Sequence, residues 1–274
     1  MRKTLATATV VKGIGLHTGL PSTLIFKPAQ DGITFLRTDI PGAKPIPALV
    51  DYVSSTLRGT NLKNETAEVC TVEHALSALH ALGITDVAVE MDGPEPPVTD
   101  GASDVYMDAL LKAGLQSLTT EQPVLKINRK ITYTSGPISY AAEPADKLTF
   151  TFLFLHKHPL VARQEYTLEF TPENYMREIA RARTFGFEEE LAFLKAHGLA
   201  KGGNLENAVI VGKDKFINEL RFPDELVRHK LLDLIGDLSL TGYKLPPLKI
   251  TCTCGGHKHN VIFAKILVSN AEEK

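Results

Sequence analysis

Residues 223–240 read PDELVRHKLLDLIGDLSL and predict one long helix with two unlike faces. The leading proline and the acidic pair after it are typical of a helix start. At about 100° per residue, the apolar side chains gather on one core face, namely Val227, Leu231, Leu234, Ile235 and Leu238. The polar side chains gather on the opposite face, namely His229, Lys230, Asp233 and Asp237.

The polar face of this helix has two interpretations. A stripe of charged residues on a single helix is typical of a solvated surface. However, Leu226 and Leu240 fall in the same sector, which indicates that a second element covers it. His229 and Asp233 also have the i, i+4 spacing at which two side chains can grip one ion. A metal site is therefore the alternative to a solvated face.

A second helix is expected at residues 71–82, TVEHALSALHAL, with Gly83 as its C-terminal stop. His74 lies opposite the apolar face, and the small side chains of Ala78 and Ala81 beside it allow another helix to come close. Glu73 precedes His74 in the first turn. An HExxH motif is absent, which excludes the usual helical arrangement of zinc proteases.

Together the two helices offer two histidines and one aspartate, which with one water make the composition of a catalytic zinc site. Water bound to zinc has its pKa lowered to roughly 7, and Glu73 is placed to accept its proton. The segment CGGH at 254–257 brings His257 as a proton donor for a leaving group, with Asp237 to hold the imidazole. Spacing alone leaves this hypothesis open beside the solvated one.

Strands followed by helices occur twice along the chain, which predicts an α+β protein with helices packed on antiparallel sheets. The best linker is at residues 114–123, so we expect domains at 1–118 and 122–274. Strands are expected at 4–11, 22–27, 33–37, 85–91, 124–133, 138–142, 148–155, 164–170 and 248–253, and further helices at 104–113 and 172–183.

Composition excludes several classes of protein. The 274 residues carry a formal charge of −2, so no basic surface argues for nucleic acid or an anionic membrane. No apolar run approaches the roughly 18 residues of a membrane span, and the first residues show no signal peptide. Three cysteines favour a reducing cytoplasm over a disulfide framework. Cys252 and Cys254 are interpreted as buried strand thiols, with metal binding as the alternative.

Seven segments in one order along almost the whole chain carry a family resemblance. They are GIGLHTG (13–19), TVEHALSALHALGITDVAVEM (71–91), PPVTDGAS (96–103), ARTFGF (182–187), GLAKGGNLENAVIVG (198–212), VRHKLLDLIGDL (227–238) and GGHKHN (255–260). With them the chain resembles the UDP-3-O-acyl-N-acetylglucosamine deacetylases, zinc amidases of lipid A biosynthesis in Gram-negative bacteria. Each segment is weak alone, whereas seven in register are highly specific.

The resemblance implies a fold of two similar two-layer α/β sandwich domains, with their helices facing each other and the active site between them. It implies that His74, His229 and Asp233 hold one Zn²⁺ per chain, and such a set also accepts Fe²⁺. Glu73 then resembles the general base and His257 the general acid. Asp237 would orient His257, and Thr184 would donate to the oxyanion.

The resemblance also implies the substrate, a UDP-sugar that carries a 3-O-acyl chain and loses the acetyl group of its 2-acetamido nitrogen. Lys230 matches a lysine that helps to hold the sugar nucleotide. A βαβ insert at about 185–211 would form an apolar passage for the acyl chain, and Phe185, Leu191, Leu194 and Gly203 in it are expected to bind substrate. Within the insert, Phe187, Leu191, Leu194 and Gly198 recur at near-helical spacing and form one apolar edge, which as a bare pattern is more typical of a core.

Two alternatives stay open. A zinc amidase for another acetylated sugar would share the metal ligands and would not need the apolar passage. A structural zinc module would need a closed site with four protein ligands, for which Cys252 or Cys254 would have to turn inward. Nothing in the sequence demands more than a monomer.

Overall fold

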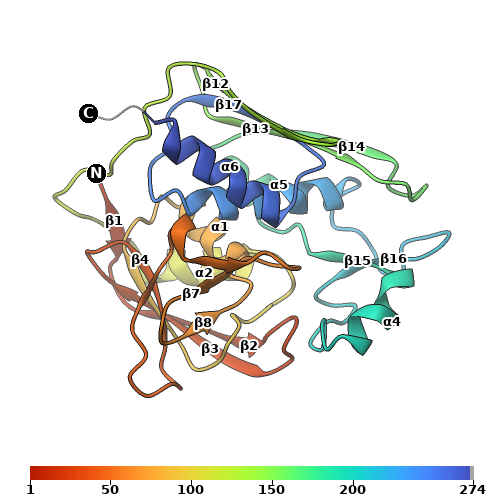
Figure 1. The fold of residues 1–274 in the computed structure, drawn as a ribbon. Coiled ribbons are helices and arrows are strands. Elements are labelled where there is room, and N and C mark those ends of the chain that lie inside the picture. The colour runs from red at the N-terminus through yellow and green to blue at the C-terminus, as the bar shows by residue number, and fades with distance from the viewer. Residues whose placement is uncertain (272–274) are drawn as a thin grey trace.

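The computed structural model describes residues 1–271, in which two five-stranded sheets form the outer layers and the main helices lie between them (Figure 1). The first sheet has the strand order β2-β3-β9-β4-β5. Its strands are β2 (Thr9–Ile14), β3 (Pro21–Pro28), β4 (Ile33–Arg37), β5 (Ile46–Pro47) and β9 (Val87–Met91).

The second sheet has the order β11-β12-β17-β13-β14. Its strands are β11 (Ile131–Ser135), β12 (Ile138–Pro144), β13 (Thr149–Leu155), β14 (Arg163–Glu169) and β17 (Leu248–Thr253). In both sheets the strand that comes last in the sequence occupies the centre, antiparallel to the second strand and parallel to the third. The two halves therefore share one topology.

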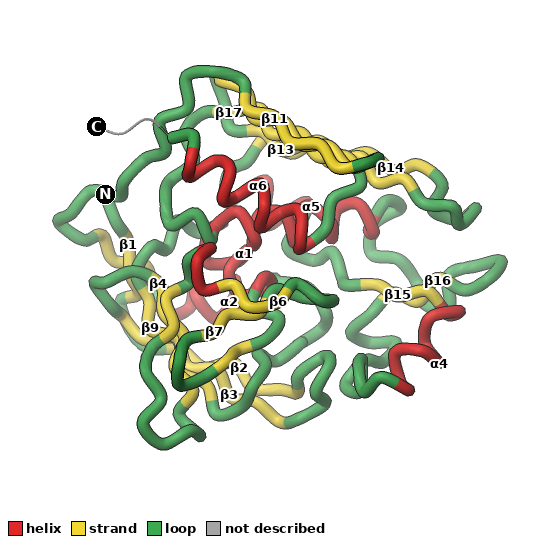
Figure 2. The backbone as a smooth tube through the Cα atoms, in the orientation of Figure 1, coloured by secondary structure: helices red, strands yellow, loops and turns green. Residues whose placement is uncertain are grey.

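The helices form the inner layers (Figure 2). In each half one helix precedes the central strand and another follows it: α1 (Glu73–Ala81) and α2 (Asp104–Ala113) around β9, and α5 (Glu225–Ser239) and α6 (His257–Ser269) around β17. Helix α1 packs directly against α5. The expected fold class, α+β with helices that face each other between two sheets, is confirmed.

Alternating burial along the strands explains these layers, because successive side chains of a strand point to opposite faces. In β3, Leu24 and Phe26 are fully buried while Ile25 between them is partly exposed. In β13, Phe150 and Phe152 show the same alternation. Each sheet thus has one apolar face, which the helices cover.

Smaller elements complete the chain. A two-stranded sheet joins β1 (Lys3–Leu5) to β10 (Leu115–Ser117), and a three-stranded sheet contains β6 (Val53–Ser55), β7 (Asn61–Lys63) and β8 (Glu68–Val69) after the 3₁₀ turn at Val50–Tyr52. Helix α3 spans Pro172–Glu178. The parallel pair β15 (Phe185–Phe187) and β16 (Val209–Val211) flanks α4 (Glu188–Ala196) at one side of the molecule (Figure 1). Among residues 1–271, no helix has the length and apolarity that crossing a bilayer requires.

Helix α6 was not predicted from the sequence. It begins at His257, and neither an acidic residue in its first turn nor a capping side chain marks its start. The expected linker also contains strand β10, which pairs with β1. Edge pairing of this kind depends on a distant partner, so local sequence does not reveal it.

Two expected elements are shorter in the structure. The strand expected at 124–133 begins only at Ile131, because the earlier residues make a single bridge, Val124 to Lys244. The helix expected at 172–183 ends at Glu178. Beyond it the chain turns, and the Ala180 carbonyl accepts a hydrogen bond from the backbone N–H of Ser103 at 2.9 Å.

The interpretation of the two neighbouring cysteines as buried strand thiols is half right. Cys252 lies in β17 and is buried, and burial raises the pKa of its thiol to about 12. Cys254 lies beyond the end of the strand, with a φ of 54° and a partly exposed side chain. The two thiols therefore do not share one buried face.

Candidate metal centre and active site

Helices α1 and α5 bring two histidines and an aspartate into one buried cluster. His229 Nε2 lies 3.3 Å from Asp233 Oδ1, and His74 Nε2 lies 3.8 Å from the same oxygen. The two imidazole rings meet edge to face with centroids 5.0 Å apart. The ligand atoms of all three residues lie within 4.8 Å of one another. The i, i+4 pair predicted on one helix is thus completed by a histidine from the other.

A glycine makes this close approach of the helices feasible. A Cβ atom on Gly236 would lie 2.2 Å from the backbone oxygen of Glu73. Real Cβ atoms do not come so near to backbone, so any other residue in this position would push α1 and α5 apart. Gly236 therefore sets the distance between His74 on α1 and the two candidate ligands on α5.

The hydrogen bonds of the cluster fit a metal ion. Asp233 Oδ1 is buried and has no hydrogen-bond partner, which is costly unless another group satisfies it. His229 Nδ1 lies 3.0 Å from the Ala182 carbonyl oxygen, so its N–H donates there and Nε2 keeps a lone pair toward the cluster. A metal-binding histidine typically donates the N–H of its other ring nitrogen to a backbone carbonyl in this way, which fixes the tautomer and the orientation of the ring.

The protonation states of these three residues also favour the binding of a cation. Burial and the neighbouring His229 lower the pKa of His74 to about 3, and burial lowers the pKa of His229. Both imidazoles are therefore neutral, the form that binds metals. Burial opposes ionisation of Asp233, but His229 and Lys230 outweigh it and hold the pKa of this carboxyl below its ordinary value.

A second group of titratable residues stands beside the cluster. His257 Nε2 lies 3.8 Å from Glu73 Oε1 and 3.9 Å from Asp233 Oδ2. Its other nitrogen, Nδ1, lies 2.9 Å from Asp237 Oδ2 and donates to that carboxylate. This bond leaves Nε2 as the nitrogen that faces Glu73 and the candidate metal ligands.

The two groups of this pair have opposite surroundings. Burial raises the pKa of Glu73 to about 7, with a further contribution from Asp237 and Asp233 and a partial offset from His257. Burial lowers the pKa of His257, but Asp237 and Glu73 outweigh it and raise this pKa to about 10. Perturbed pairs of this kind are typical of acid–base sites.

The cluster opens into a cavity of about 290 Å³. Its walls include all three candidate ligands, both Glu73 and His257, and Thr184. Lys230 also lines it, with Nζ 2.7 Å from Asp233 Oδ2 and 5.5 Å from the centre of the Phe185 ring. The residues predicted to carry chemistry, except the fully buried Asp237, thus face one space.

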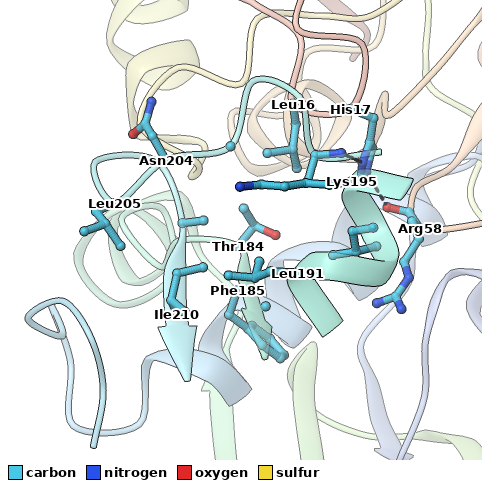
Figure 3. A pocket seen from close by; sticks show the side chains of 15 residues that line it. Leu16, His17, Arg58, Thr184, Phe185, Leu191, Lys195, Asn204, Leu205 and Ile210 are labelled. Carbon is cyan, nitrogen blue, oxygen red and sulfur yellow. Dashed lines mark hydrogen bonds between the residues drawn. The ribbon is translucent and has the colours of Figure 1, made fainter. Parts of the chain in front are cut away.

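A second cavity of about 260 Å³ adjoins the first, and the two share Leu16, Arg58, Thr184 and Phe185 (Figure 3). Its walls come largely from the insert between β15 and β16. The insert residues expected to bind substrate, Phe185, Leu191, Leu194 and Gly203, line this cavity, whereas Phe187 of the expected apolar edge lines the first cavity and Gly198 lines neither. Leu16 and Ile210 add apolar surface on either side of Thr184 (Figure 3).

A buried ion pair holds the segment that carries Thr184. Glu225 is fully buried at the start of α5 and accepts hydrogen bonds from Arg183 N at 3.0 Å and Arg183 Nε at 2.9 Å. It also accepts from the backbone N–H of Arg221 at 2.6 Å. This carboxylate therefore ties the segment to the helix that provides two candidate ligands.

Replacing Glu225 by alanine is expected to lower the free energy of unfolding by about 3–5 kcal/mol, because it leaves the Arg183 guanidinium buried without its counter-charge. Denaturant unfolding followed by circular dichroism measures this loss. Glu65→Ala, at an exposed position, is the matched control. A loss for Glu225→Ala no larger than for the control would contradict the assignment.

Sequence reasoning missed several residues of the site. Thr60 donates its N–H to Glu73 Oε2 and its hydroxyl to Asp237 Oδ1. Asn260 donates to Asp237 Oδ2 at 2.8 Å, and Arg58 lines both cavities. Asn260 follows His257 by three residues, so an expected helix at that point would have indicated it. For the loop residues Thr60 and Arg58 no local signal existed.

The groups of residues 1–271 that have metal-binding geometry are His74 with His229 and Asp233, and Glu73 with Asp233 and His257. Neither group contains a cysteine. The closed structural zinc site, which needed Cys252 or Cys254 as its fourth ligand, therefore has no support in the described part of the chain.

Two facing helices with a buried histidine–aspartate cluster, a neighbouring glutamate–histidine pair and an open cavity are an arrangement typical of hydrolases. The profile of the family of UDP-3-O-acyl N-acetylglycosamine deacetylases matches residues 2–269. The chain belongs to this family.

Three relatives illustrate the similarity, each named UDP-3-O-acyl-N-acetylglucosamine deacetylase. The protein of Nautilia profundicola is 38% identical over 264 residues, which cover 95% of this chain and 90% of the relative. The protein of Myxococcus xanthus is 40% identical over 245 residues, which cover 88% and 78%. The protein of Citrifermentans bemidjiense is 40% identical over 263 residues, which cover 94% and 86%.

Proposed function

We propose that this chain hydrolyses the 2-acetamido group of UDP-3-O-acyl-N-acetylglucosamine in lipid A biosynthesis. The products are acetate and the free amine. The observation that carries the proposal is the cluster of His74, His229 and Asp233 beside Glu73 and His257 in one cavity. Membership of the deacetylase family supports the substrate.

We propose that His74, His229 and Asp233 hold one Zn²⁺ per chain, with Fe²⁺ as the alternative. The unpartnered Asp233 Oδ1 and the two neutral imidazoles support this ligand set. When bound, such an ion supplies a water of lowered pKa and polarises a carbonyl oxygen. Removal of the metal with a chelator should therefore abolish activity.

The residues around this site have complementary tasks in the proposal. Glu73 takes a proton from the attacking water, whose oxygen adds to the amide carbon. Thr184 Oγ donates to the oxyanion that forms. His257 then gives the proton of Nε2 to the leaving nitrogen as the C–N bond breaks. Asp237 holds the imidazole through Nδ1, 2.9 Å away.

The substrate contacts follow from the two cavities. Lys230 lines the first cavity, where it would help to hold the sugar nucleotide. The second cavity is lined by Phe185, Leu191, Leu194 and Gly203. It offers an apolar site for the acyl chain, which is attached to the sugar carbon next to the one that bears the acetamido group. Domain boundaries at 1–118 and 122–274, a cytoplasmic location and a monomeric state remain predictions.

The first experiment measures acetate release from the acylated UDP-sugar and from its unacylated parent, with metal content determined on the same sample. Turnover of the acylated substrate alone, with one metal per chain, supports the whole proposal. Equal turnover of both retains the amidase and rejects the acyl passage. No turnover with tightly held metal rejects the enzyme and leaves a structural metal site.

Replacing Leu191 and Leu194 together by alanine is expected to lower kcat/KM for the acylated substrate about 10-fold or more, because burial of one leucine contributes roughly 1.5–3 kcal/mol. Steady-state kinetics on both substrates measures the effect, and the unacylated parent should lose nothing. Phe193→Ala is the matched control, since this side chain lies on the same helix and is 57% exposed. Equal losses on both substrates would contradict an acyl passage here.

A further inference from the structure

We propose that Thr60 is a positioning residue, whose hydroxyl fixes Asp237 and through it the orientation of His257. The inference rests on the proposed function, because only there does His257 act on a leaving group. Thr60 itself lies outside the ring of residues that line the cavity of the cluster.

All three polar groups of Thr60 are directed at the site. Thr60 precedes β7 and is completely buried. Its backbone N–H donates to Glu73 Oε2 at 2.9 Å, and its carbonyl accepts from the backbone N–H of Val72, at the start of α1, at 3.1 Å. Its hydroxyl donates to Asp237 Oδ1 at 2.6 Å, and the hydroxyl oxygen lies 3.4 Å from His257 Nδ1. One residue thus joins the carboxyl of α1 to that of α5.

The loop that leads into Thr60 passes close to the candidate base. A Cβ on Gly59 would lie 3.1 Å from Thr71 Oγ1 and 3.2 Å from Glu73 Oε1. The loop therefore runs in van der Waals contact with the candidate base. Because its backbone N–H and its carbonyl are both hydrogen-bonded, Thr60 holds its hydroxyl in one position.

The two oxygens of Asp237 have different partners. Oδ2 accepts from His257 Nδ1 at 2.9 Å and from Asn260 Nδ2 at 2.8 Å. Asn260 is itself oriented, since its Oδ1 accepts from the Tyr140 hydroxyl at 2.6 Å. Within residues 1–271, the Thr60 hydroxyl is the hydrogen-bond donor that reaches Oδ1. Asp237 is fully buried, so bulk water does not take that place.

Loss of the hydroxyl has a defined consequence. Asp237 Oδ1 would be left buried without a donor, which is costly for an ionised group. The carboxylate would then turn toward the donors that remain, and the imidazole bonded to Oδ2 would turn with it. His257 Nε2 would lose its alignment with the space in front of Glu73, 3.8 Å away. Small misplacements of this kind reduce turnover more than binding.

The test compares T60V with T60S in the metal-loaded enzyme. Valine keeps the shape and the backbone N–H but lacks the hydroxyl, whereas serine retains it. We expect T60V to lower kcat about 10- to 100-fold, the loss of one hydrogen bond to a charged group, with KM and metal content unchanged. T60S should restore most of kcat. T60A serves as a second variant if T60V does not fold.

A double-mutant cycle with D237N separates positioning from general stability. If Thr60 acts through Asp237, the T60V effect on kcat disappears in the D237N background. An equal effect in both backgrounds, a T60S variant as slow as T60V, or a T60V variant with full activity overturns the proposal. A wild-type enzyme that does not turn over the acylated UDP-sugar rejects instead the proposed function.

Discussion

Replacing His257 by alanine is expected to lower kcat about 10²- to 10⁴-fold, the usual contribution of a general acid or base, while the metal stays bound. His257 Nε2 faces Glu73 and Asp233 at 3.8 and 3.9 Å, and its Nδ1 is engaged by Asp237. Kinetics and metal analysis on one preparation measure both effects.

Comparison with His74→Ala distinguishes the loss of the general acid from the loss of the metal. His74 belongs to the cluster that contains the unpartnered Asp233 Oδ1, so its loss should remove the metal and the activity together. His259→Ala is the matched control for His257→Ala. His259 lies in the first turn of the same helix and contacts Tyr133, away from the cluster. Loss of metal from His257→Ala would show that His257 is a ligand and not the acid.

Helical periodicity alone could reveal much of this site. The i, i+4 spacing of His229 and Asp233, with Leu226 and Leu240 on the same sector, indicated a covered polar face. In the structure both leucines are fully buried: α1 and α6 pack against α5, and Leu226 lies in an apolar cluster with Phe187, Val209 and Val211. The pattern within one helix is local, so a single sequence contains it.

The residues that pack around that helix could not be predicted from a local pattern. Thr60 is 177 residues away from Asp237, and their contact depends on the path of a loop between short strands. Helix α6 has no capping signal, because two glycines precede it and its first turn is basic, without an acidic residue. The second cavity depends on how the insert folds back over Leu16, a contact that no spacing encodes. Tertiary packing decided each of these features.

The second large effect is expected from replacing Gly236 by alanine, and it concerns the free energy of unfolding. In an ordinary helix interior this change is favourable by about 1 kcal/mol, because alanine is the better helix former. Here the new Cβ would lie 2.2 Å from the Glu73 backbone oxygen. We therefore expect the sign to reverse, with the free energy of unfolding lowered by about 1–3 kcal/mol, as for other overpacked cores. Denaturant unfolding measures it, and Asp108→Ala at an exposed position of α2 is a control for helix propensity, with an expected gain of up to about 0.7 kcal/mol.

The same substitution should damage the metal centre more than the fold. The clash is relieved by moving α1 away from α5, and this movement separates His74 from His229 and Asp233, which now meet within 4.8 Å. A displacement of about 1 Å at a reacting centre can cost 10²-fold in rate. Metal affinity and kcat should therefore fall together in the folded variant. A Gly236→Ala protein with normal metal content and activity would show that the helices can separate without disturbing the cluster, and that the glycine does not set its geometry.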